Sequence, residues 1–228
     1  MGMPPISPDR SKFFPKIAVS TPRPETRRRN GMTVIRCANP LVWGELDLPL
    51  FGISKDWYGT ALTSQAAFCV AVDPRRLWFV ASHGKPAKLH PAARPARFVP
   101  ELWKYDVAEL FLSDPTSGRY FEFNLSPNAA WWSCEFKSPR QRVEETDIFF
   151  PDVATYAELS PDGGWIAAMA IPLDLLEARL NFGETTKLNV NFIVESPEQR
   201  FLSVANLGEG EPDFHRPERF SPVKFHNA

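Results

Sequence analysis

Residues 107–125 read VAELFLSDPTSGRYFEFNL, two runs of alternating side chains on either side of a turn at residues 114–117. A period of two is typical of a β-strand that buries one face, and Asp-Pro-Thr-Ser is typical of a turn. If Ser113 pairs with Gly118, one face of the hairpin is entirely apolar and belongs in a core. That face consists of Ala108, Leu110, Leu112, Phe121, Phe123 and Leu125. The hairpin therefore predicts a sheet that packs against a second layer.

The opposite face of this hairpin is polar and aromatic. It consists of Val107, Glu109, Phe111, Tyr120, Glu122 and Asn124. The predicted register sets Glu109 directly opposite Glu122, and opposed like charges destabilise a strand pair. A basic side chain, a bound cation, a shared proton or a ligand that donates hydroxyls to both carboxylates would relieve this repulsion. Residues 188–195 alternate in the same way, with Asn189, Asn191 and Glu195 on their polar side, so we expect one polar sheet face.

Short β-rich runs separated by turn residues recur along the chain. They fall at residues 33–38, 68–72, 77–82, 107–112, 120–125, 131–136, 165–171, 188–195, 201–205 and 222–225. One short helix is expected at residues 173–180, opened by Pro172 and closed before Asn181. The predicted fold is all-β, a jelly-roll-like antiparallel β-sandwich with one short helix. The segment 84–100, which holds four prolines, is expected to be a long crossing loop.

Composition and charge narrow the classes of function. The chain has 228 residues, 43% of them hydrophobic, and its longest apolar runs, 66–72 and 165–171, are too short for a membrane-spanning helix. Residues 1–31 are expected to be a Pro/Arg-rich leader, and residues 32–228 a single domain. No nucleic-acid-binding motif accompanies the basic leader, so we expect neither a nucleic-acid nor a membrane partner. The N-terminus lacks the pattern of a signal peptide, which predicts a cytoplasmic location.

Five segments carry a resemblance to a known family. They are WKYDVAELFL at 103–112, YFEFN at 120–124, WIAAMAIP at 165–172, LNVNF at 188–192 and FHRPERF at 214–220. Together and in this order they resemble the family 9 carbohydrate-binding modules and their DOMON-like β-sandwich relatives, over about residues 33–225. The resemblance implies a non-catalytic protein that recognises a small sugar or a glycan end.

The resemblance also implies a site. In that family a tryptophan stacks on the sugar while a glutamate and amide side chains bind its hydroxyls; the matching positions here are Trp103, Glu109, Asn124 and Asn189. This sequence departs from the family where Glu122 stands in place of an arginine and where FLSV at 201–204 lacks a second tryptophan. Trp131, Trp132 or Tyr120 could compensate, but adjacent residues of a strand face opposite sides, so only one of the two tryptophans can reach the site. The predicted ligand-binding residues are Trp103, Glu109, Glu122, Asn124, Trp131, Asn189, Asn191 and His215.

Other functions remain open at this stage. The alternative is a protein-interaction or structural β-sandwich that has lost sugar binding, with a protein as partner. Glycoside hydrolysis by the two glutamates is less favoured because no other catalytic motif is present, so an enzyme is not expected. No cofactor is expected, although a structural calcium ion at Asp106, Asp114, Glu109 and Glu122 is an option. A cleft lined by both Trp103 and Glu109 would favour sugar binding, whereas an arginine between the two glutamates would favour a scaffold.

Overall fold

The computed structural model describes residues 31–228. The leader predicted at residues 1–31 lies outside these residues, apart from Gly31. The strands are β1 (Met32–Arg36), β2 (Phe51–Lys55), β3 (Ala61–Val72), β4 (Arg76–His83), β5 (Val107–Ser113), β6 (Tyr120–Leu125), β7 (Trp131–Ser138), β8 (Gln141–Arg142), β9 (Ala154–Leu159), β10 (Trp165–Pro172), β11 (Lys187–Val194), β12 (Arg200–Ser203) and β13 (Ser221–Asn227). The helices are α1 (Leu173–Leu180) and the 3-10 turns η3 (Leu102–Lys104) and η4 (Pro217–Arg219).

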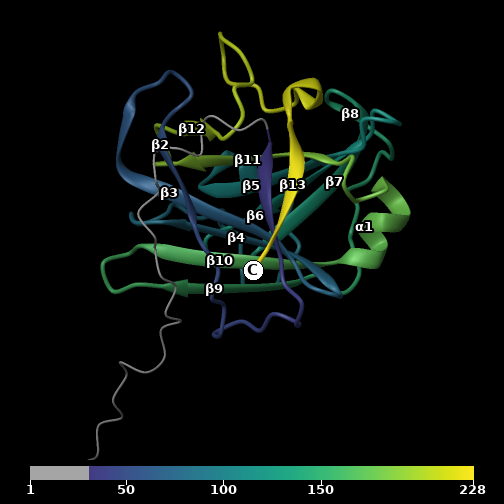
Figure 1. Cartoon of the computed structure of the whole chain (residues 1–228). Coiled ribbons are helices and arrows are strands. Elements are labelled where there is room, and N and C mark those ends of the chain that lie inside the picture. Colours follow the sequence, from purple (N-terminus) through teal and green to yellow (C-terminus); the bar gives the residue numbers. More distant parts are fainter. Residues whose placement is uncertain (1–30) are drawn as a thin grey trace, which may run out of the picture.

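The strands form two facing layers, as Figure 1 shows. One layer, the β5 sheet, has the order β8-β7-β6-β5-β11, with β12 beside the second half of β11. The other, the β4 sheet, has the order β1-β3-β4-β10-β9, with β2 beside β3. Strand β13 joins the layers, because Ser221 and Pro222 pair with β11 and residues 223–227 pair with β1. The predicted all-β sandwich is confirmed.

One part of the predicted topology is wrong. Strand β1 runs parallel to both of its neighbours, β3 and β13, so the sandwich is not purely antiparallel. Parallel neighbours need a long connection between them. Strands β1 and β13 satisfy this requirement because they are the first and last strands of the described residues, with the rest of the sandwich between them.

The register of the β5–β6 hairpin also differs from the prediction. Ser113 pairs with Tyr120 and Glu109 pairs with Asn124, so the two glutamates do not oppose each other. The prediction placed Gly118 in the ladder, whereas it lies in the loop, two residues before β6, with φ +72°, a conformation that favours glycine. The loop is fastened by Asp114, whose carboxylate accepts the Thr116 N–H at 2.9 Å. Because the error is two residues along the ladder, each side chain keeps its predicted face.

The core lies between the sheets. Its largest fully buried side chains include Phe79 on β4 and both Phe121 and Phe123 on β6. Helix α1 closes one end of the core with Leu176 and Leu180, and it follows Pro172 and ends at Asn181 as predicted. None of the helices within residues 31–228 has the length and apolar character needed to cross a bilayer.

A second apolar cluster covers the outer face of the β5 sheet. Val99 and Leu102 from the segment after β4, and Leu207, Phe214 and Phe220 from the segment after β12, pack there. In Figure 1 the segment between β12 and β13 arches over β11. The crossing loop predicted at residues 84–100 is a loop, with one bridge between Phe98 and Trp131. These two coverings leave only part of the outer face open.

The sequence pattern missed several strands. In the β4 sheet, β2, β9 and the first half of β3 were not predicted, and in the β5 sheet β8 was not predicted. The sequence of β9, ATYAEL, lacks valine and isoleucine, which are the usual strand signal. Its pairing with β10 shows that neighbouring strands, rather than local propensity, determine this element.

Candidate functional site

A row of polar side chains crosses the outer face of the β5 sheet. Cross-strand pairing links Trp132 on β7 to Asn124 on β6, then Glu109 on β5, Asn191 on β11 and Ser203 on β12. The row follows directly from the hairpin register, because Glu109 pairs with Asn124 on one side and Asn191 on the other. Five strands thus hold these five side chains next to one another on one face.

Several atoms in this polar row have no partner. Within the described residues, Asn124 Oδ1, Asn191 Nδ2 and Trp132 Nε1 are buried without a hydrogen bond. Glu109 is only 2% exposed, and no residue from 31 to 228 forms an ion pair with it. A buried polar group left unpaired costs about 1–3 kcal/mol. The row is therefore an unsatisfied set of one carboxylate, one amide donor, one amide acceptor and one indole N–H.

A pocket of about 350 Å³ opens over Glu109. Its polar lining is Glu109, Glu122, Arg140, Arg142 and His215, and its apolar lining is Trp103, Trp132, Phe136, Ile193, Phe201, Pro212 and Phe214. Trp103, on η3, is 46% exposed. Trp103 and Glu109 thus line one cleft, which is the arrangement that favours sugar binding over a flat docking surface.

Glu122 is held by a short network. The Asn124 amide donates to Glu122 Oε1 at 3.0 Å. The Arg140 N–H donates to the Tyr120 hydroxyl at 3.1 Å, and that hydroxyl shares a hydrogen bond of 2.8 Å with His215 Nδ1. His215 Nε2 lies 3.7 Å from Glu122 Oε2. His215 is packed against Phe111 and Phe136, which fixes the ring.

The electrostatics of the pocket follow from burial. Desolvation, together with the negative charge of Glu122, raises the pKa of Glu109 well above its usual range. Desolvation raises the pKa of Glu122 to about 7, against the lowering effects of the Asn124 hydrogen bond and of Arg142 and Arg140. Burial and the charge of Arg140 lower the pKa of His215 to about 4. At neutral pH the imidazole is therefore uncharged, and Glu122 is the carboxyl group whose pKa lies close to this pH.

The structure brings most of the predicted site residues together. Trp103, Glu109, Glu122 and His215 line the pocket. Asn124 and Asn191 lie beside Glu109 in the polar row. No arginine of the described chain lies within ion-pair distance of both glutamates, so the arrangement that would favour a scaffold is not found there.

Asn189 has a different place from the one predicted. Its amide donates to Asn191 Oδ1 at 2.7 Å and to Ser203 Oγ at 2.9 Å, and its oxygen accepts the Ala205 N–H at 2.9 Å. Its hydrogen-bonding atoms are thus used within the protein. Asn189 orients the Asn191 amide, and Asn191 keeps the free donor.

The prediction of Trp131 as a site residue is wrong. Trp131 pairs with Leu125 and therefore shares the core face of β6, where it is 1% exposed. Trp132 lies on the outer face and lines the pocket. The turn before β7 occupies residues 126–130, closed by the Ser126 N–H donating to Ala130 O, and its length determines which tryptophan faces out. With the length of this turn known, strand alternation assigns Trp132, and not Trp131, to the outer face.

Four other lining residues had no sequence signal. Arg140 lies in the turn after β7 and Arg142 in the short strand β8, and Phe201 and Phe214 lie far along the chain. They reach the pocket because β12 pairs with β11 and the segment after β12 folds back over the β5 sheet. Only the assembled topology places them there.

The residues considered for calcium are not gathered. The Asp106 carboxylate accepts the Ser196 and Lys88 N–H groups, and the Asp114 carboxylate accepts Thr116 N–H and the Asn181 amide. The part of the chain that the structure describes holds no group of three or more side chains suited to a metal ion. Asp106 and Asp114 are thus engaged in hydrogen bonds within the fold, and the structural calcium ion stays a prediction.

Comparisons with known proteins give likeness in structure alone. No protein-family model matches the sequence, and no curated protein is significantly similar to it. A candidate carbohydrate-binding protein from Bacteroides uniformis superposes with a TM-score of 0.63 at 15% sequence identity, over 86% of this chain and 100% of that chain.

Two further matches have a family name. A family 9 carbohydrate-binding module from Caldicellulosiruptor kristjanssonii in complex with glucose gives a TM-score of 0.55 at 15% identity, over 86% of this chain and 96% of that chain. A family 9 module from the same organism in complex with cellotriose gives 0.53 at 14% identity, over 86% and 95%. The resemblance to family 9 modules is confirmed at the level of the fold.

Proposed function

We propose that the protein is a non-catalytic carbohydrate-binding protein that holds a small sugar or a glycan end in the pocket over Glu109. The observation that carries this proposal is that the half-exposed Trp103 lines the same pocket as Glu109, a buried carboxyl group with no ion-pair partner among residues 31–228. A pyranose has an apolar C–H face that suits an indole surface, and a rim of hydroxyls that need both donors and acceptors. The pocket offers both kinds of contact within one cavity.

The polar groups that line the pocket have a role in this proposal. The Glu109 carboxylate accepts sugar hydroxyls, which gives the stronger, charge-assisted type of hydrogen bond. Asn124 and Asn191 flank Glu109 in the polar row and are fully buried, so they support Glu109 from behind the pocket wall. The sugar-bound states of the two family 9 neighbours support the same kind of ligand here.

The test is calorimetric titration of the full chain with glucose, cellotriose and a panel of other mono- and disaccharides. We expect saturable binding to at least one sugar and a loss of at least tenfold in affinity for Trp103→Ala and for Glu109→Gln. Phe149→Ala is the matched control, since Phe149 is 61% exposed and does not line the pocket. The proposal fails if the folded wild-type protein binds no sugar at millimolar concentration, or if the control loses affinity as much as the two site variants.

A further inference from the structure

The two glutamates of the pocket lack a cationic partner. Both are buried, and both line the same cavity. Within residues 31–228 the one basic group within 4.0 Å of either carboxylate is His215, whose Nε2 lies 3.7 Å from Glu122 Oε2. His215 is neutral at pH 7, because burial and the charge of Arg140 lower its pKa to about 4. It therefore supplies no positive charge to Glu122.

The arginines of the pocket are paired elsewhere. Arg140 Nη2 lies 2.8 Å from Asp213 Oδ1, and Arg142 Nη1 lies 2.6 Å from Asp147 Oδ1. Neither guanidinium reaches Glu109 or Glu122 within 4.0 Å, although both lower the pKa of Glu122 from a longer distance. The other titratable groups nearby, Tyr120 and Cys134, stay neutral because burial raises the pKa of each.

A buried carboxylate without a partner is strongly disfavoured, and it either takes up a proton or attracts a cation. A neutral sugar can donate hydroxyls to these groups but cannot balance their charge. An ammonium group can do both, since it has three donors and one positive charge. Trp103, Trp132 and Phe214 line the pocket, and aromatic rings favour nearby cations in a partly desolvated site. Lys104 already lies over the Trp103 ring at 5.4 Å and Arg142 over the Trp132 ring at 5.5 Å.

We propose, on the basis of the sugar site above, that the preferred ligand is an amino sugar whose ammonium group binds between the Glu109 and Glu122 carboxylates. The proposal adds a charge requirement to the proposed function. It explains why the outer face of the β5 sheet holds two carboxylates where one would suffice to bind hydroxyls.

The experiment compares neutral and amino sugars at pH 7 by calorimetric titration of the full chain. The probes are glucose, glucosamine and N-acetylglucosamine, with galactose and galactosamine as a second pair that differs in one hydroxyl configuration. We expect at least one amino sugar to bind tenfold or more tightly than its neutral parent, and N-acetylglucosamine to lose this advantage because its nitrogen is uncharged. In Glu109→Gln and Glu122→Gln the ratio of amino to neutral affinity should fall towards one.

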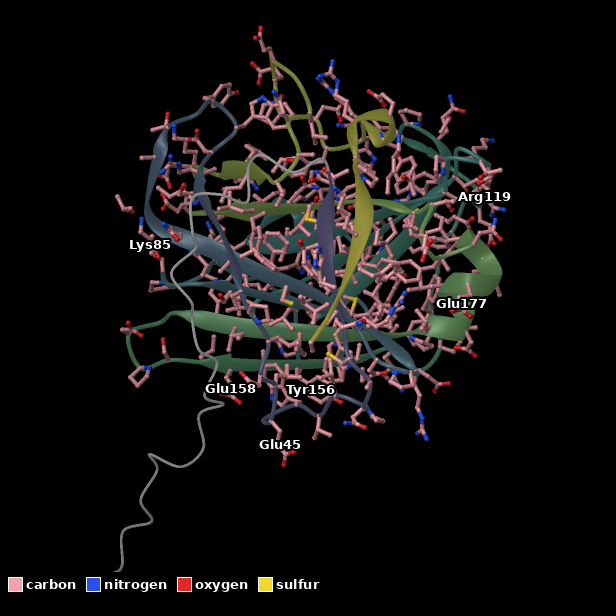
Figure 2. All side chains as sticks on the ribbon, viewed as in Figure 1. Glu45, Lys85, Arg119, Tyr156, Glu158 and Glu177 are labelled. Carbon is pink, nitrogen blue, oxygen red and sulfur yellow. The ribbon has the colours of Figure 1, made fainter. Side chains whose placement is uncertain are left out.

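Glu45→Gln is the control for charge removal. Glu45 lies on the far side of the molecule, near β9 (Figure 2), and is exposed. It should keep the wild-type preference. Equal affinities of the wild-type protein for amino and neutral sugars would overturn the inference and leave the proposed sugar site standing. If no sugar binds to the folded protein, both proposals fail.

Discussion

Glu122→Gln should make the protein more stable at pH 8 but not at pH 4. Burial raises the pKa of Glu122 from 4.5 to about 7, so the folded state holds a proton that the unfolded state releases between these pH values. The contribution of protonated Glu122 to the free energy of unfolding is therefore fully present below pH 4.5 and is lost as the pH rises through about 7. At 1.36 kcal/mol per pKa unit, the loss is about 3 kcal/mol. Glutamine has no such proton and still offers Oε1 to the Asn124 amide.

Urea denaturation of both proteins at pH 4, 5, 6, 7 and 8 measures this difference. The free energy of unfolding of the variant minus that of wild type should be near zero at pH 4 and rise towards about 3 kcal/mol at pH 8. Glu45→Gln removes an exposed carboxylate and is the matched control, with a difference expected to change little over the range. Parallel pH profiles for Glu122→Gln and wild type would refute the reasoning, because they would mean that Glu122 is ionised at no cost in the folded state.

Three further predictions concern stability. Phe150→Ala should lower the free energy of unfolding, measured by urea denaturation, by about 3–5 kcal/mol, because Phe150 is 1% exposed. The neighbouring substitution Phe149→Ala should lower it by under about 1 kcal/mol, because Phe149 is 61% exposed. Equal losses in the two variants would contradict the burial of Phe150. Gly118→Ala should cost about 1 kcal/mol because φ is +72°, and Gly118→Asn should cost less; the reverse order would contradict a conformational cause. Arg119→Met should lower the free energy of unfolding by about 1–3 kcal/mol, because it leaves the buried Glu135 carboxylate with only the more distant Arg179. The double variant Arg119→Met/Glu135→Gln should recover most of this loss. No recovery would refute the ion pair as the cause.

The fold was predictable because its decisive segment has a clear period. In the β5–β6 hairpin, side-chain parity assigned every residue to the correct face even though the register was off by two. Parity survives such an error because it depends only on whether the shift is odd or even. Turn geometry was the part that failed. Gly118 could sit in the ladder or in the loop on sequence grounds, and only its left-handed conformation decides.

The candidate site was predictable where it rests on strands and unpredictable where it rests on loops. Glu109, Asn124 and Asn191 follow from alternation within β5, β6 and β11. Alternation shows that only one of Trp131 and Trp132 can reach the site, but the choice between them depends on the length of the turn before β7, which sets the parity of that strand. The aromatic walls at Phe201 and Phe214 depend on chain segments that return to the sheet from far along the sequence, for which local pattern carries no information.

Two asparagines on the same strand separate a structural from a ligand-binding interpretation of the polar face. Asn189 uses both its amide hydrogens and its oxygen within the protein, which is what a structural polar network requires. Asn191, two residues along β11 and on the same face, is oriented by Asn189 but keeps its own donor unpaired among residues 31–228. If the outer face served only to complete the fold, selection for stability would favour pairing or removing that donor, because it costs about 1–3 kcal/mol. The cost is concentrated beside Glu109 and Trp132, the two members of the polar row that line the pocket, so the strain of the polar network lies where a ligand would make contact.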